Sequence, residues 1–352
     1  MSVLKVGVAM SGGVDSTVAV SLLQDRGYQV HGFFMVLPLP NLNAQLQRVQ
    51  EVADALSVPL HHVDLRHHFS EQVIRYLHEG YLAGQTPNPC VYCNRIIKFG
   101  IFAETILHTG MDRIATGHYA RLQRVGEQNC VFRGIDPLKD QSYFLARLSS
   151  SQLDHLLFPL GGWTKAQVYQ RAGELGFHFQ GEESQDVCFL PQGLPSFFTE
   201  QGIKDKIGSI VTADGILLGR HRGVWNYTIG QRRGLGLPDA TPWYVVAIDG
   251  AANRLIVGKD KDLLQSSCLV HSLQWSHAAS SLPWRGLVQL RSRHTPAPAQ
   301  VSLDSPDCWR IRFDTLQRAI TPGQFAVFYQ GDQVVGSAVI GVPGTVPGAI
   351  TP

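Results

Sequence analysis

The stretch that decides the fold is KVGVAMSGGVDSTVAVSLLQDRG, residues 5–27 of the 352-residue chain. The apolar run at 5–10 predicts a buried strand, and the pattern at 16–26 predicts a helix that ends at Gly27. Between them lies SGGVDS at 11–16, where two glycines let the backbone adopt positive φ and approach a ligand closely. The N–H groups at the start of a helix suit a phosphate. The alternative is an ordinary turn in which Asp15 or Ser16 caps the helix.

This loop differs from two common phosphate-binding motifs. It contains no Gly-Lys-Ser/Thr, and it lacks a third glycine at dinucleotide-binding spacing. The hydroxyl groups of Ser11, Ser16 and Thr17 are available as further donors. The stretch therefore predicts a phosphate site of a different class.

Alternating strands and helices continue outward from the loop. Further strands are predicted at 29–36, 60–65 and 113–116, and helices at 45–56, 68–83, 90–107, 150–160 and 164–175. This order predicts a mostly parallel sheet that is covered on both faces. From residue 202 onward the pattern changes to short β-like runs separated by glycine, predicted at 208–212, 216–219, 244–248, 254–257, 286–291, 309–313, 325–329 and 334–340.

The predicted fold class is α/β, with an N-terminal parallel-sheet, Rossmann-like nucleotide-binding domain followed by two small β-rich domains. We place the domains at 1–204, 205–277 and 278–352, with the last one barrel-like. The tripeptide GDQ at 331–333 predicts a tight hairpin turn between two strands.

Composition limits the function classes. Thirty basic and 28 acidic side chains give a net charge of +2, so a nucleic-acid surface would require local clustering. Ten arginines crowd the C-terminal part: Arg220, Arg222, Arg232, Arg233, Arg285, Arg291, Arg293, Arg310, Arg312 and Arg318. Six cysteines are too few for a disulfide scaffold, and neither a signal peptide nor a long apolar span is apparent. We expect a cytoplasmic protein in a reducing compartment without a membrane partner.

Two cysteine segments carry the chemistry. In TPNPCVYCN at 86–94 the prolines favour an extended entry, so a helix can begin near Cys90 and place Cys90 and Cys93 on one face. A helix start and the nearby cations Arg95 and Lys98 favour thiolates. A third thiol, Cys188, follows in QDVCFL at 185–190. The other three are predicted to be small buried hydrophobes: Cys130, Cys268 and Cys308.

With SGGVDS, these segments make the chain similar to the PP-loop ATP pyrophosphatases, and within them to the bacterial tRNA-specific 2-thiouridylases. The resemblance extends over most of the chain through further segments: ATGHYAR at 115–121, KDQSYFLARL at 139–148, GRHRGVWNYTIGQRRGLGL at 219–237, WYVV at 243–246 and ITPGQFAVFYQGD at 320–332.

The resemblance implies that ATP, with Mg²⁺, adenylates the C2 oxygen of the wobble uridine of tRNA and releases pyrophosphate. The implied ATP-binding residues are Ala9, Met10, Ser11, Gly12, Gly13, Val14, Asp15, Ser16, Met35 and Gly117. Cys188 would carry sulfur as a persulfide, and Cys93 would be the partner nucleophile that forms a disulfide with it. The implied tRNA-binding residues are Asn88, Pro89, Cys90, Lys139, Asp140, Gln141, Arg291 and Ser292.

One departure from the family pattern opens a second scheme. The commonest form of the motif has Asp where this chain has Cys90, so Cys90, Cys93 and Cys188 could instead ligate a 4Fe–4S cluster with one open iron. The sulfur donor is left open among a persulfide carrier, a cysteine desulfurase and sulfide. Alternative functions are a 2-thiocytidine type of tRNA-thiolating enzyme and a non-catalytic module that binds ATP or tRNA.

Overall fold

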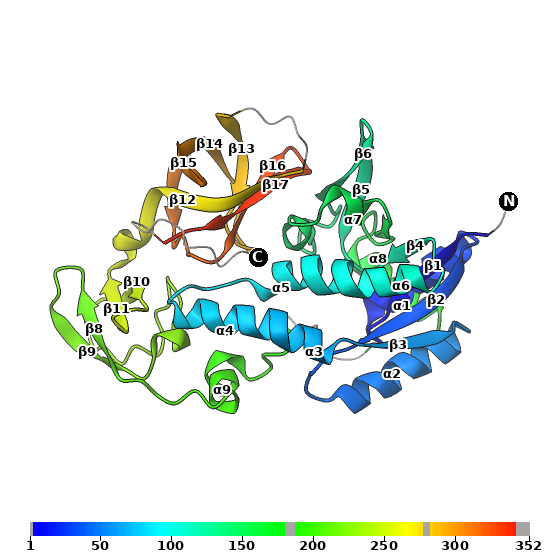
Figure 1. Ribbon diagram of the computed structural model, residues 1–352, viewed down its shortest axis with the longest axis horizontal. Helices are drawn as coiled ribbons and strands as arrows, with labels where there is room; N and C mark the ends of the chain where they lie inside the picture. The colour runs from blue at the N-terminus through cyan, green and yellow to red at the C-terminus, as the bar shows by residue number, and fades with distance from the viewer. Residues whose placement is uncertain (1–2, 180–186, 277–281, 343–352) are drawn as a thin grey trace. The chain divides into compact units, whose positions relative to one another are not determined.

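The computed structural model describes residues 3–179, 187–276 and 282–342. The chain divides into two compact units. The first consists of Met1–Val73, Cys90–Phe189 and Asp332–Val334, and the second of Ile74–Pro89, Leu190–Gly331 and Val335–Pro352. Figure 1 shows the elements of both units, which are described separately below.

The first unit is built on a five-stranded sheet with the order β3-β2-β1-β4-β7. Every neighbouring pair in it is parallel, as predicted. The strands are β1 (Lys5–Ala9), β2 (Gln29–Val36), β3 (Leu60–Asp64), β4 (Arg113–Ala115) and β7 (Leu156–Leu157).

Helices cover both faces of this sheet, which confirms the second part of the prediction. On one face, Val6 and Val8 of β1 share a buried cluster with residues of α1 (Val14–Asp25) and α2 (Leu42–Ala55). On the other face, a side chain at Gly7 would collide with Ile106 of α6 (Phe102–His108), so this helix packs directly on the strand. The alternation of Val, Gly and Val in β1 therefore sets both contacts.

Helix α8 (Lys165–Glu174) packs beside α1. Val18 and Leu22 of α1 lie in one buried cluster with Val168 and Ala172 of α8. The two helices start at the same end, because Lys165 pairs with Asp15 near both N-termini and Arg171 pairs with Asp25 near both C-termini.

The region from residue 66 to 108 forms two helical runs, 66–82 and 89–108, which are separated by residues 83–88. The first run consists of α3 (Arg66–Phe69), the π-helical segment η1 (Ser70–Ile74) and α4 (Arg75–Leu82). The second run consists of α5 (Pro89–Cys93), the π-helical segment η2 (Asn94–Ile101) and α6. Gly100 has non-helical φ of −96° and ψ of −108°, which breaks the predicted helix at 90–107 into two parts.

One prediction for this unit is wrong, and one pair of strands was not predicted. The helix expected at 150–160 ends early as α7 (Ser150–Leu153), because Leu156 and Leu157 pair with Ile114 and Ala115 as β7. A hairpin that was not predicted, β5 (Ala120–Val125) and β6 (Gln128–Arg133), follows β4.

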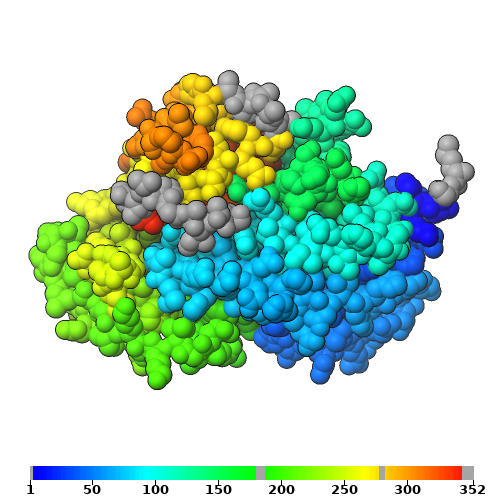
Figure 2. All heavy atoms as spheres, in the orientation of Figure 1, coloured from blue at the N-terminus to red at the C-terminus, as the bar shows by residue number. Residues whose placement is uncertain are grey.

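The second unit contains a four-stranded sheet with the order β10-β11-β8-β9. Its strands are β8 (Gly208–Thr212), β9 (Leu217–His221), β10 (Tyr244–Asp249) and β11 (Arg254–Gly258), and α9 (Gly193–Glu200) precedes them. The space-filling view shows the green and yellow-green atoms of this part at the surface of the unit (Figure 2).

The second unit also contains most of a closed six-stranded barrel. Its strands follow the order β12-β15-β14-β13-β16-β17, and pairing between β12 and β17 closes it around a buried apolar cluster. The strands are β12 (Leu264–Trp275), β13 (Trp284–Gln289), β14 (Ala297–Ser305), β15 (Cys308–Arg318), β16 (Phe325–Gln330) and β17 (Gln333–Ile340). Two small β-rich parts after an α/β part confirm the predicted fold class. The exact domain limits stay predictions, and the expected boundary at 277/278 lies outside the described residues.

The predicted hairpin turn at 331–333 is present between β16 and β17, with Gly331 at a φ of +60°. Its tip, Asp332–Val334, belongs to the first unit. There Gln333 pairs with Phe132 of β6, and Arg121 donates to the Asp332 carboxylate at 2.9 Å. Within the three described ranges, every helix is too short or too polar to span a membrane.

Candidate active site

The SGGVDS loop joins β1 to α1 in the first unit. Gly12 has a φ of +73°, and a Cβ there would lie 3.0 Å from the backbone nitrogen of Val49. The hydroxyls of Ser16 and Thr17 both donate to the Gly13 carbonyl at 3.0 Å. The N-cap is Gly13, and no described side chain caps α1 there, so capping by Asp15 or Ser16 is not observed. The first N–H groups of the helix therefore suit an anion.

Asp15 is the charged centre of the loop. Its Oδ1 accepts two hydrogen bonds of 2.6 Å, one from the Tyr119 hydroxyl and one from the Lys165 ammonium. The Lys165 side chain is 10% exposed and the Asp15 side chain 35%, so the pair is partly shielded from water. This shielding strengthens the charge interaction.

The segment after β4 packs closely against the SGGVDS loop. A Cβ at Gly117 would lie 2.9 Å from two atoms of Asp15 and 3.1 Å from the nitrogen of Ser16. Gln141 holds this segment, because its side-chain carbonyl accepts from the Tyr119 N–H at 3.0 Å. The structure therefore places Gly117, a predicted ATP-binding residue, directly against the loop.

The remaining predicted ATP-binding residues lie at the neighbouring strand ends. Ala9 pairs with Phe33 in the parallel register, and the Met10 N–H donates to the Phe33 carbonyl at 2.9 Å. Met35 follows on β2, near its carboxyl end. Because carboxyl ends of parallel strands share one edge of a sheet, these residues and the loop meet at that edge.

Cys90, Cys93 and Cys188 lie close enough to influence one another electrostatically, and the charge of Lys98 reaches all three. Burial raises the pKa of Cys90 to about 11 and that of Cys93 to about 12. Burial also raises the pKa of the Cys188 thiol. This residue is exposed to water on one side, and protein surrounds it on the others. The expectation of favoured thiolates is therefore wrong, because desolvation outweighs the nearby cation.

All six cysteines lie in the described ranges and carry free thiols. Cys130 and Cys308 are buried, and Cys268 packs against the barrel core, which fits small hydrophobes. In the described part of the chain, no three His, Cys, Asp or Glu side chains are placed to hold a single metal ion. A 4Fe–4S cluster distributes its thiolates over separate irons. Ligation of a cluster by Cys90, Cys93 and Cys188 therefore stays a prediction.

Two of the predicted tRNA-binding residues are committed to internal bonds. The Asp140 carboxylate accepts from Arg133, from the Gly134 N–H, and from both the N–H and the hydroxyl of Ser142, at 2.9 to 3.0 Å. Gln141 supports Tyr119 as described above. Lys139, on the same segment, is half-buried.

The other predicted tRNA-binding residues belong to the second unit, apart from Cys90. Asn88 donates to the Gln324 side chain at 3.5 Å, and Gln324 donates to the Thr86 carbonyl at 2.8 Å. Pro89 follows at the start of α5. Arg291 is half-buried, with Nη1 3.5 Å from the carbonyls of Arg318 and Ala319, and Ser292 is exposed.

Several C-terminal arginines pair with carboxylates instead of standing free. Ion pairs of 2.6 to 2.9 Å join Arg222 to Asp205, Arg285 to Asp314, Arg310 to Asp304 and Arg318 to Asp260. These pairs reduce the positive charge that the sequence alone suggests.

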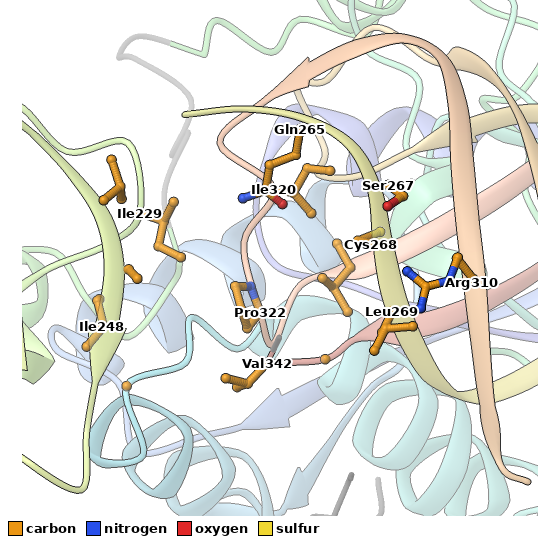
Figure 3. A pocket seen from close by; sticks show the side chains of 15 residues that line it. Ile229, Ile248, Gln265, Ser267, Cys268, Leu269, Arg310, Ile320, Pro322 and Val342 are labelled. Carbon is orange, nitrogen blue, oxygen red and sulfur yellow. The ribbon is translucent and has the colours of Figure 1, made fainter. Parts of the chain in front are cut away.

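A cavity of about 390 Å³ lies in the second unit. Its walls include Ile248 of β10 and Ser267, Cys268 and Leu269 of β12, with Arg310 at one side (Figure 3). None of the predicted site residues lines it. Burial raises the pKa of the Cys268 thiol to about 12.

Sequence reasoning missed Lys165 and Tyr119 as partners of Asp15. A signal for Lys165 was present, because Thr164 and Gln167 form a capping box that fixes Lys165 as the first residue of a helix. A cation is unfavourable there unless an anion compensates it. Finding that anion, however, required the fold.

Three family models match the chain in order. They are the "tRNA methyl transferase HUP domain" over residues 4–192, the "tRNA methyl transferase PRC-barrel domain" over 196–259 and the "Aminomethyltransferase beta-barrel domain" over 265–340. Among solved structures, a 4-thiouridine synthetase–RNA complex with bound ATP matches with a TM-score of 0.34 and 18% identity, over 49% of this chain and 40% of that one. This likeness is too weak for an inference.

Curated relatives match along nearly the whole length. The tRNA-specific 2-thiouridylase MnmA of Desulfotalea psychrophila is 45% identical over 338 residues, which is 95% of this chain and 98% of the relative. The protein of the same name from Syntrophotalea carbinolica is 42% identical over 342 residues, 95% of this chain and 97% of the relative. The order of domains, the SGGVDS loop and these identities together show that the chain belongs to the tRNA-specific 2-thiouridylase family.

Proposed function

We propose that this chain is an ATP-dependent tRNA-uridine 2-sulfurtransferase that thiolates C2 of the wobble uridine. The observation that carries the proposal is a phosphate-suited loop, with Asp15 held by Lys165 and Tyr119, in the same unit as three mutually interacting thiols. The matched family models are named for methyl transfer, but the full-length relatives are named for thiolation, and three thiols in the same unit as the loop fit the latter.

In the proposed first step, the uridine C2 oxygen attacks the α-phosphorus of ATP and pyrophosphate leaves. Residues 9–16, with Met35 and Gly117, would hold ATP with its Mg²⁺, and the N–H groups at the start of α1 would face the pyrophosphate. Adenylation is needed because the C2 oxygen is otherwise a poor leaving group. Sulfur then attacks C2, and AMP leaves.

In the persulfide scheme, the outer sulfur of a Cys188 persulfide attacks C2. The Cys93 thiolate then attacks the inner sulfur of Cys188, which leaves the outer sulfur on the base and closes a Cys93–Cys188 disulfide. An external dithiol must reduce this disulfide before the next turnover. The scheme gives Cys90 no chemical role.

In the cluster scheme, Cys90, Cys93 and Cys188 would hold a 4Fe–4S cluster, which when bound supplies an open iron for sulfide. The donor set fits such a group, since three thiols share one electrostatic neighbourhood. Their raised pKa values mean that these thiols need a bound cation to stay deprotonated at neutral pH. Lys98 helps by lowering the pKa of each of the three thiols.

The test of the function is mass spectrometry of tRNA nucleosides after incubation with ATP, Mg²⁺ and either sulfide or a persulfide donor. We expect 2-thiouridine, AMP and pyrophosphate. Asp15→Ala and Ser16→Ala should abolish adenylation, because the pyrophosphate loses its positioning. Release of ADP and phosphate would contradict the PP-loop assignment. Formation of 2-thiocytidine, or no product at all, would favour the alternative functions.

A second experiment separates the two sulfur schemes. The protein is purified without oxygen, iron and sulfide are quantified, and Cys90→Ser and Cys90→Asp are compared with the Cys93 and Cys188 variants. An iron-free enzyme that thiolates tRNA from a persulfide, with Cys90→Asp fully active, eliminates the cluster. Loss of iron and activity in each single cysteine variant eliminates the plain persulfide scheme.

A further inference from the structure

Lys165 occupies an unfavourable position for a cation. It is the first residue of α8, where the helix dipole is positive, and its side chain is only 10% exposed. Both the dipole and the loss of hydration disfavour an ammonium group there. A compensating interaction must therefore hold the charge in place.

Asp15 supplies that compensation. The Lys165 ammonium lies 2.6 Å from Asp15 Oδ1, and it also lies 5.5 Å from the ring centre of Tyr119 and 5.1 Å from that of Tyr169. Both hydrogen bonds to the carboxylate reach Oδ1, and Oδ2 accepts none from the described residues. The lysine thus binds an acid that belongs to the phosphate loop itself.

The acid poses an electrostatic problem for the loop. A site that receives the phosphates of ATP contains the carboxylate of Asp15, which repels them at close range. The helix start offers about half a positive charge, which does not cancel a full negative one. A neutralised Asp15 removes the repulsion while keeping the hydrogen bond that Tyr119 donates.

We propose that Lys165 is a positioning residue of the ATP site, which neutralises Asp15 and holds it so that the loop can receive the pyrophosphate moiety of ATP. This inference rests on the proposed function in one respect, namely that ATP binds the SGGVDS loop.

The chain offers a matched control on the same two helices. Arg171 of α8 donates to Asp25 of α1 at 2.6 Å and to Ser21 at 3.0 Å, at the end remote from the loop. Lys165→Met and Arg171→Met therefore each remove one ion pair between α8 and α1. Only the first of these pairs includes an acid of the loop.

The experiment measures the affinity for Mg–ATP by calorimetry for wild type, Lys165→Met, Lys165→Arg, Asp15→Asn, the double variant Asp15→Asn with Lys165→Met, and Arg171→Met. We expect Lys165→Met to weaken binding about tenfold or more, because the carboxylate becomes uncompensated. Lys165→Arg should recover most of the affinity. The double variant should bind no more weakly than Asp15→Asn alone, because Lys165 acts on ATP only through the Asp15 carboxylate.

A purely structural lysine predicts a different pattern. The double variant would then lose as much affinity relative to Asp15→Asn as Lys165→Met loses relative to wild type, and this result would overturn the proposal. An equal loss in Arg171→Met would also overturn it, because docking of α8 would be the cause. If Lys165→Met does not fold, Lys165→Gln is measured in its place, and an ATP affinity equal to that of wild type overturns the proposal.

The outcome is separable from that of the proposed function. Wild type that binds no Mg–ATP at all refutes the ATP site and the proposed function together. Wild type that binds ATP and forms 2-thiouridine, with ATP affinity unchanged in Lys165→Met, refutes only the role of Lys165.

Discussion

The thiols of Cys90 and Cys93 are protonated at neutral pH in the free protein, because burial raises the pKa of each to about 11 or 12. Protonated thiols are poor nucleophiles and poor metal ligands. Deprotonation of these thiols therefore depends on a nearby positive charge, and Lys98 already lowers the pKa of both.

Alkylation with iodoacetamide, followed by mass spectrometry, tests this state. Cys188 should react first because it is exposed, and Cys93 last. The rates should keep rising from pH 7 to beyond pH 9, since the raised pKa leaves little thiolate at lower pH. Lys98→Met should slow the reaction, because the lysine lowers the pKa of all three thiols.

Arg95→Met is the control, since Arg95 is not a cause of any of the three shifts. A rate that levels off near pH 7 in the wild-type protein would contradict the raised pKa values.

At the scale of elements, the short segment between β4 and β5 fixes the loop through Gly117. Gly117→Ala should disturb the start of α1, because the added methyl would lie 2.9 Å from Asp15 atoms. We expect ATP affinity to fall about tenfold and stability to fall by about 1–3 kcal/mol, as for other overpacked sites. Calorimetry of ATP binding and denaturant unfolding measure the two effects.

Gly162→Ala is the matched control in the same unit, because a Cβ there meets no atom within 4 Å. It should change stability by less than about 0.5 kcal/mol. Equal effects of the two substitutions would show that Gly117 has no special place beside the loop.

Strands whose sequence shows a recognisable apolar pattern could be predicted. Strands that contain proline or many polar residues could not. The apolar runs at 5–10 and 29–36 form β1 and β2 as predicted, because most of their neighbouring residues are buried together in the sheet. Strand β14 was missed because Pro298 lies in it, and proline normally argues against a paired strand. Strand β12 was missed because its polar residues interrupt the alternation of apolar and polar side chains. The positive φ of Ser272 also makes the strand irregular.

The candidate site shows the same division. The loop residues could be predicted because they are contiguous, from Ser11 to Ser16. The contact between Asp15 and Lys165 could not, because the two residues are 150 positions apart and only the packing of α8 on α1 joins them.

At the scale of the whole molecule, tRNA binding should depend on salt through the arginines that no acid neutralises. Arg291 has no carboxylate partner among the described residues. Arg291→Ala should weaken tRNA binding and reduce the slope of log Kd against log salt by about one, if its guanidinium meets a phosphate. Filter binding at several salt concentrations measures the slope, and ATP affinity should not change.

Arg285→Ala is the comparison, because Asp314 already accepts two hydrogen bonds of 2.9 Å from this arginine. Its effect on the slope should be smaller. An unchanged slope in Arg291→Ala would show that this arginine does not contact a tRNA phosphate.

The hairpin tip Asp332–Val334 has a consequence for biosynthesis. Because these residues complete the first unit, the ribosome must translate past residue 334 before that unit can close. Until then, Phe132 lacks its partner Gln333, and the Arg133 N–H lacks the Asp332 carbonyl that it reaches at 2.9 Å. An open strand edge of this kind invites pairing with other chains. A nascent chain halted before residue 332, or a recombinant fragment that ends there, should therefore depend on chaperones to stay in solution.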